Sequence, residues 1–448
     1  MRSDMYKCYL LLPCRLVLAM LASVLLSSSG MASADFQGAT HIMPFDEDTI
    51  NYSKTSATGP IARLQERIDK GEVKLKQQGA SGYLLSLLEE LKVPKSSQML
   101  VFSKTSFQRE RISPRNPRAL FFNDDVYVGW VPGSPLLEVS IADPKLGAVF
   151  YTLEQAETAR PKFVRMDQCL ECHASAKTMG VPGHVIRSFA TDDDGVVDLA
   201  TGTSLVNHRT PLEERWGGWY VTGTHGNQLH RGNLIGKAAF ARQEKEPNYL
   251  GNLTTLDPFF EISRYPSPYS DIVALMVLEH QTHMHNFITR LNYESTLALQ
   301  QYGHLNYLKN ATEAFLKYLL FVEEAPLTAP VKGASEFTSW FAQQEPKDKQ
   351  GRSLREFDLK TRLFKYPCSY LIYSEAFDQL PEKMRLHLYQ RLWDILSGKD
   401  ADPEFQKIPS ETRQAILDIL IDTRKGLPAY WKKDRGTSDS TAKQISGR

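Results

Sequence analysis

The stretch Cys169-Leu170-Glu171-Cys172-His173 constrains this chain more than any other. Two thiols stand two residues apart and an imidazole follows at once, which is the pattern for covalent attachment of a c-type haem. The cysteine sulfurs form thioethers with the two vinyl groups of the haem, and the histidine supplies the proximal nitrogen ligand of the iron. The motif therefore predicts one covalent haem c, bound by Cys169 and Cys172 with His173 on the iron.

Two other chemistries use paired cysteines, and both fit this sequence less well. A zinc ribbon needs a second pair of Cys or His residues at matching spacing, and none follows. A thioredoxin-like dithiol needs a βαβ setting in which the motif opens a helix, and the flanking residues do not indicate one. Haem attachment is the favoured interpretation.

The N-terminus has the pattern of an export signal. Basic residues precede an apolar run over 16–26, and the small residues Ala32-Ser33-Ala34 follow it. We expect 1–34 to be a cleaved signal peptide; the alternative is an uncleaved anchor helix, which the shortness of the apolar run disfavours. Because c-type haem is attached outside the cytoplasm in bacteria, the two signals together predict an exported protein, in the periplasm of a bacterium.

Composition and cysteine usage exclude some partners. The chain has 448 residues, enough for about two or three domains, and its net charge of +1 favours no nucleic-acid partner. We expect no transmembrane span once the signal is cleaved. Cys8 and Cys14 belong to the predicted signal and two more cysteines to the motif, so Cys368 has no disulfide partner; its apolar neighbours indicate a buried, inert thiol.

Hydrophobic periodicity predicts an α+β fold, with an antiparallel β-rich half that carries the haem motif and a mainly α-helical C-terminal half. Amphipathic patterns predict helices over 60–78 and 82–92, and β-rich runs separated by turn residues predict a sheet within 97–152. Further strands are expected around 184–189 and 216–223.

From about residue 268 the pattern becomes helical. Ser270 and Asp271 are predicted to cap a long helix that extends to about Leu291. Further helices are expected over 293–323, 335–344, 382–397 and 410–424. The predicted segments are a signal peptide (1–34), an arm with helices (35–95), a β-rich haem region (96–265), a helical region (266–432) and a disordered tail (433–448).

Four groups of residues carry a resemblance to a known family: 169–175 with 181–188, then 211–226, 270–281 and 366–376. On these residues the chain resembles exported bacterial proteins with a single cytochrome c motif, a family that is largely uncharacterised. The resemblance implies a haem-binding, extracytoplasmic protein and brings no known reaction.

The ligand that faces His173 across the iron decides the function, because the sixth position separates electron carriers from gas binders and enzymes. His225 and His230 are the candidate distal ligands, because they flank a Gly-rich loop that follows an aromatic strand. The alternative for each is an ordinary hydrogen-bonding histidine. Further candidates are Met179, His184 and His208.

Two other groups of polar residues merit attention. Arg187, Arg215 and Arg231 are candidate partners of the haem propionates, since a guanidinium matches a carboxylate in geometry. The histidines of 279–285 indicate a partly buried polar helix face, with a second metal site as the alternative, and the order of a zinc protease motif is absent.

Three functions remain open for such a protein. The first is electron transfer between the haem iron and a redox partner protein or a small-molecule donor or acceptor. The second is haem-based sensing or ligand binding, and the third is a haem-dependent oxidoreductase with an open distal site. Electron transfer is our first choice. Carrying electrons on a single haem does not account for so long a chain, so the other two functions stay open.

Overall fold

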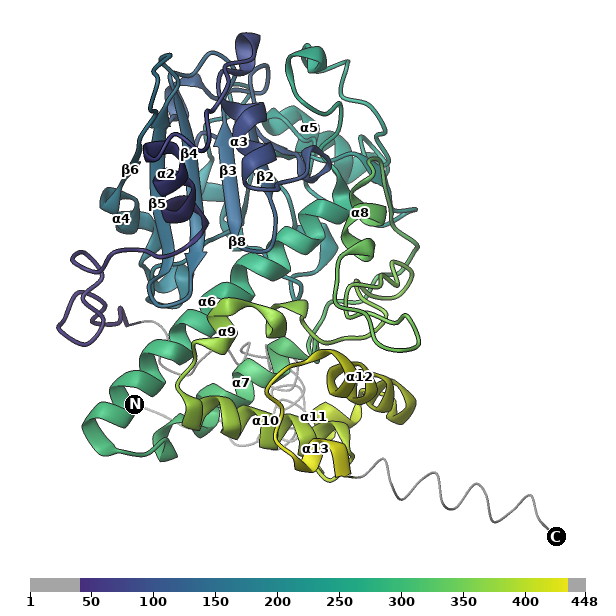
Figure 1. The fold of residues 1–448 in the computed structure, drawn as a ribbon. Helices are drawn as coiled ribbons and strands as arrows, with labels where there is room; N and C mark the ends of the chain where they lie inside the picture. Colours follow the sequence, from purple (N-terminus) through teal and green to yellow (C-terminus); the bar gives the residue numbers. More distant parts are fainter. Residues whose placement is uncertain (1–40, 434–448) are drawn as a thin grey trace, which may run out of the picture.

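The computed structural model describes residues 41–433 and has an α+β architecture (Figure 1). Its N-terminal half is rich in antiparallel sheet and its C-terminal half is mostly helical. The predicted signal peptide lies outside the described residues, as does the predicted tail apart from Lys433, which ends the last helix. Within 41–433 no helix has both the length and the apolar character that a membrane crossing requires.

A seven-stranded antiparallel sheet organises the first half, in the order β6-β5-β4-β3-β2-β1-β9. Its strands are β1 (Met99–Val101), β2 (Arg118–Phe122), β3 (Val126–Trp130), β4 (Leu136–Asp143), β5 (Gly147–Glu154), β6 (Phe163–Arg165) and β9 (Trp219–Tyr220). The sheet predicted within 97–152 is thus confirmed, and β6 and β9 extend it at its two edges. Two-stranded ladders are formed by β7 (Arg187–Phe189) with β8 (Thr203–Leu205), and by β10 (Gly223–Thr224) with β11 (Lys332–Gly333).

One face of the sheet is covered by α2 (Pro60–Asp69) and α3 (Leu84–Glu90), as Figure 1 shows. Alternate strand residues such as Val128, Val139 and Val149 point to this side and share one apolar core with the two helices. Strand alternation therefore divides the sheet into two buried faces, which is why its strands contain few exposed positions.

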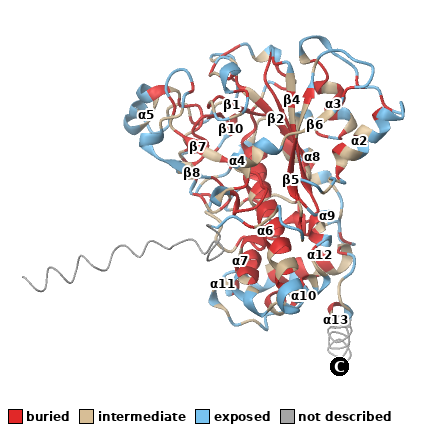
Figure 2. Cartoon of the chain, turned by 90° about the vertical axis from the view of Figure 1, so that its left-hand side faces the viewer, coloured by how far each residue is buried: buried red, intermediate tan, exposed pale blue. Residues whose placement is uncertain are grey.

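The opposite face is covered by α6 (Ile272–Tyr302), a helix of 31 residues that is buried along most of its length (Figure 2). Phe122 and Tyr127 from the sheet belong to the same apolar core as the first turns of α6, and the helix then continues into the helical half. A second helix was expected to begin near 293. Instead α6 runs on to Gly303, where a left-handed glycine ends it, because no glycine or proline interrupts it earlier.

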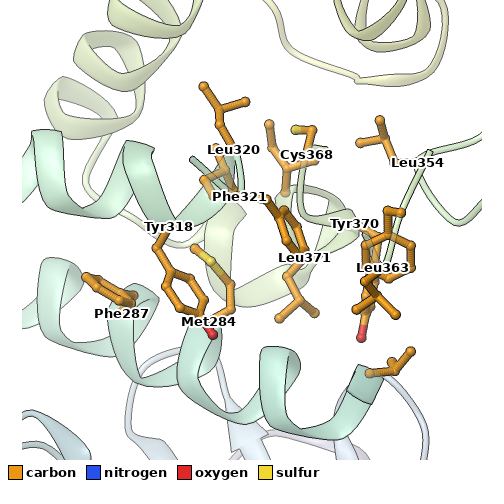
Figure 3. Packing of buried hydrophobic residues seen from close by; sticks show 14 of the residues in the cluster. Met284, Phe287, Tyr318, Leu320, Phe321, Leu354, Leu363, Cys368, Tyr370 and Leu371 are labelled. Atoms are coloured by element: carbon orange, nitrogen blue, oxygen red, sulfur yellow. The ribbon is translucent and has the colours of Figure 1, made fainter. Parts of the chain in front are cut away.

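The helical half packs along α6, including its N-terminal end, where Ser335 binds the Asp271 side chain. Its helices are α7 (Lys309–Leu319), α8 (Phe337–Gln343), α9 (Glu375–Asp378), α10 (Glu382–Leu396), α11 (Pro403–Gln406), α12 (Ser410–Thr423) and α13 (Tyr430–Lys433). A further helix, α5 (Gly236–Lys245), lies in the first half and was not predicted. Cys368 is fully buried in the apolar cluster of Figure 3, beside Leu371 and Tyr370, which confirms the expected buried thiol.

Asp271 caps α6, as predicted. Its Oδ1 accepts the N–H groups of Val273 (2.8 Å) and Ala274 (3.1 Å), and its Oδ2 accepts the N–H of Ser335 (2.7 Å). The Asp271 side chain is fully buried, and so are its bonds to Val273 and Ala274, so these two donors have no access to water as a substitute partner.

Replacing this cap tests the importance of α6 for the fold. Asp271→Ala should lower the free energy of unfolding by about 2–4 kcal/mol in urea titrations, because several buried N–H groups lose their acceptor. Asp402→Ala is the matched control: Asp402 caps only the four-residue α11, through Glu404, and should cost about 1 kcal/mol. Equal losses for the two variants would contradict a special role for the α6 cap.

Candidate functional site

The Cys-Cys-His motif lies on a single helical turn that follows β6. Cys169 ends a short 3-10 turn, and α4 (Leu170–His173) continues from it. Positions i, i+3 and i+4 of a helical turn share one face, so both sulfurs and the imidazole lie on the same side of the chain. Cys172 is exposed, Cys169 is half-buried, and neither forms a disulfide. The thiols are therefore accessible to a planar group laid against this face.

The imidazole of His173 is oriented by a backbone carbonyl. Its Nδ1 lies 3.0 Å from the oxygen of Gly183, and because a carbonyl only accepts, Nδ1 is the donor and carries the proton. The lone pair is then on Nε2, which is the arrangement that metal-binding histidines adopt. The ring packs against Phe150 with 4.7 Å between centroids, and burial lowers the pKa of His173, which favours the neutral form.

Gly183 is itself held from α6. The side chain of Asn286 accepts the N–H of His184 (2.9 Å) and donates to the carbonyl of His184 (2.7 Å). A Cβ on Gly183 would lie 2.3 Å from Asn286 Oδ1, so the glycine permits this close approach. Sequence reasoning missed Asn286. The signal available in the sequence was an amide side chain placed among the apolar residues of a predicted helix.

Cys169 is the more sheltered of the two thiols of the motif. Burial, followed by the negative charge of Glu138, raises the pKa of the Cys169 thiol to about 11, although Arg118 acts in the opposite direction. Redox-active and metal-binding cysteines need a lowered pKa so that the thiolate forms at neutral pH. Within 41–433 no three His, Cys, Asp or Glu side chains are grouped so that they could hold a metal ion.

His225 and His230 lie against each other. Both are buried, and their ring centroids are 4.6 Å apart. His230 Nδ1 accepts the N–H of Gly232 (2.9 Å), so the neutral ring carries its proton on Nε2; burial, and then the charge of His225, lower its pKa to about 3. Neither ring nitrogen of His225 has a hydrogen-bond partner among the described residues.

Among the described residues, neither histidine of this pair forms a hydrogen bond or a ring contact with the motif. In the part of the chain that the structure describes, the ring neighbours of His230 are His225 and Trp216, and those of His173 include Phe150. Both residues predicted as distal ligands are thus brought together, whereas no described hydrogen bond or ring contact joins either to His173. Their distal role stays a prediction.

The further distal candidates have other partners. His184 follows Gly183 on the Nδ1 side of His173, and its Nε2 lies 2.9 Å from Ser140 Oγ. Met179 is buried in the apolar core at a left-handed backbone angle, φ +59°. His208 Nδ1 lies 2.8 Å from His280 Nδ1.

The polar face predicted for 279–285 is present, and it is more deeply buried than expected. His280 Nε2 lies 2.8 Å from Ser369 Oγ, which ties α6 to the helical half. Glu279 forms a buried ion pair with Arg215 and accepts the indole N–H of Trp216. Arg215, which the sequence suggested as a partner of the haem propionates, thus already has Glu279 as its carboxylate partner.

Comparison with models of protein families, with curated proteins and with solved structures finds no match to this chain. The chemistry of the site therefore has to be inferred from its own residues. Three properties matter most: two accessible thiols on one helical face, an imidazole with a free Nε2 lone pair, and a carbonyl that fixes this tautomer.

Buried histidines make the stability of the fold depend on pH. His285, on α6, donates from Nε2 to the carbonyl of Asp124 (2.8 Å), and burial lowers its pKa from 6.5 to about 4. Below pH 6.5 the unfolded chain binds a proton here that the folded chain does not. The contribution is therefore complete above pH 6.5 and is lost as the pH falls toward 4, by about 1.4 kcal/mol per pH unit.

This dependence is removable with one substitution. His285→Gln keeps an N–H donor for Asp124 and should reduce the slope of unfolding free energy against pH by about 1.4 kcal/mol per unit between pH 6 and 4.5. Urea titrations at several pH values measure the slope. His304→Gln, at an exposed position, is the control and should keep the wild-type slope. An unchanged slope in His285→Gln would show that this residue titrates equally in both states.

Proposed function

We propose that this protein is an exported c-type cytochrome, with one haem bound covalently to Cys169 and Cys172 and with His173 as the proximal iron ligand. The observation that carries the proposal is the hydrogen bond from His173 Nδ1 to Gly183, because it leaves Nε2 as the coordinating atom. When bound, the haem supplies one-electron chemistry between Fe(II) and Fe(III). Electron transfer is the proposed role.

The protein's own residues set the properties of the axial ligand. The carbonyl of Gly183 draws on the Nδ1 proton and makes the imidazole more basic, which favours the ferric state. Asn286 holds the backbone of His184 and so limits movement of that carbonyl. Phe150 packs on the ring of His173 and restricts its rotation. These contacts would limit the movement of His173 when a bound haem changes its oxidation state.

Covalent attachment is the first test. The full chain, expressed with a haem c maturation system, should retain haem after denaturation, and the Cys169→Ala/Cys172→Ala double variant should lose it, as measured by intact mass and by absorbance after denaturing electrophoresis. Cys368→Ala is the matched control, since that thiol is buried in the helical half, and should retain haem. Covalent haem in the double variant would show the proposal to be wrong.

Carbon monoxide distinguishes a carrier from a protein with an open distal site. We expect a six-coordinate haem that does not bind CO in the ferrous state. If His225 is the sixth ligand, His225→Ala should give a high-spin, CO-binding haem. His230→Ala should leave the spectrum unchanged, because Nε2 of His230 carries its proton. A wild-type haem that binds CO would instead support haem-based sensing or a haem oxidoreductase.

A further inference from the structure

Arg187 is held firmly at both its backbone and its side chain. It lies on β7, opposite Leu205 of β8, and its carbonyl accepts the indole N–H of Trp219 (3.0 Å). Its guanidinium lies over the ring of Phe189, 4.3 Å from the centroid. The side chain is half-buried, so the position of this positive charge is fixed by packing.

The charge of Arg187 has no carboxylate partner among residues 41–433. Other sheltered guanidinium groups do have one: Arg118 pairs with Glu138, and Arg355 pairs with Asp124. The Nε of Arg187 is buried without a hydrogen-bond acceptor. Burial accordingly lowers the pKa of Arg187, and only the Cys172 thiol acts in the opposite direction. A sheltered cation of this kind is costly unless an anion joins it.

Arg187 begins β7 only four residues after Gly183, whose carbonyl lies 3.0 Å from His173 Nδ1, so this strand follows directly from the segment that orients the motif histidine. A haem attached through Cys172 carries two propionate groups, and a guanidinium binds a carboxylate through two parallel hydrogen bonds. We propose that Arg187 binds a haem propionate and so orients the haem against β7. This inference rests on the proposed function, and it selects one of the three arginines that the sequence suggested.

An acidic side chain of a redox partner has the same chemistry as a propionate. We favour the propionate because Arg187 lies four residues from Gly183, which orients His173, and stacks on Phe189 within the protein's own packing. The two sources differ in an isolated sample: a propionate is present without any partner. The test therefore uses the purified, haem-loaded full chain alone.

Removing this charge should change the midpoint potential of the haem. Arg187→Gln should lower the potential by about 59 mV, an about tenfold change in the redox equilibrium, because loss of a nearby positive charge favours Fe(III). Arg187→Lys keeps the positive charge but loses the planar group that makes two parallel hydrogen bonds to a carboxylate. It should therefore lower the midpoint potential by a smaller amount. Arg385→Gln makes the same charge change at a half-buried arginine of α10 in the helical half, where the side chain donates to the carbonyl of Leu380, and should leave the potential unchanged.

The outcomes separate this inference from the proposed function. Absence of covalent haem in the wild-type chain would defeat the proposed function itself. Haem-loaded Arg187→Gln with the wild-type potential would overturn the role of Arg187 while leaving the cytochrome intact, as would an equal shift in Arg385→Gln. Should Arg187→Gln fail to fold, the Lys variant decides: a lowered potential supports the propionate contact, and an unchanged one overturns it.

Discussion

Buried polar side chains on α6 connect the two halves of this fold. Glu279 pairs with Arg215 in the loop before β9, and Gln281 joins Tyr127 of the sheet to Tyr370 of the helical half. Asn286 holds the segment that follows the motif. Each of these groups would cost about 1–3 kcal/mol if it were buried without a partner. Because the partners come from both sides, α6 can satisfy them in only one rotation and one register.

Local patterns in the sequence predicted much of this fold, and long-range contacts account for what they missed. The strands between 97 and 152 and the Asp271 cap follow from alternation and capping chemistry. The helix predicted over 60–78 ends at Asp69, because Gly71 adopts a left-handed angle just after it. Helix α5 was missed because it is mostly exposed and has only a weak apolar side.

In the candidate site, too, residues close together in the sequence could be predicted, whereas contacts between distant residues could not. The motif could be recognised because its chemistry is contiguous in the chain. The support of His173 could not, since Asn286 acts on His184 from 102 positions away. The Gly-rich loop that they flank drew attention to His225 and His230, and the fold does bring the two together, yet their ring contacts are with each other and with Trp216. Arg215 was a reasonable propionate partner until the fold paired it with Glu279.

The two hydrogen bonds between Asn286 and the backbone of His184 bear on the order of haem attachment and folding in the proposed cytochrome. The thiols belong to one short stretch of chain, so thioether formation needs no completed tertiary structure. The carbonyl that fixes the His173 tautomer is set only when α6 docks, and docking must close a long loop, which is among the slower steps of folding. Attachment and axial geometry are therefore separable in time. A chain could carry its haem early and acquire its final redox properties only when α6 has docked onto the sheet.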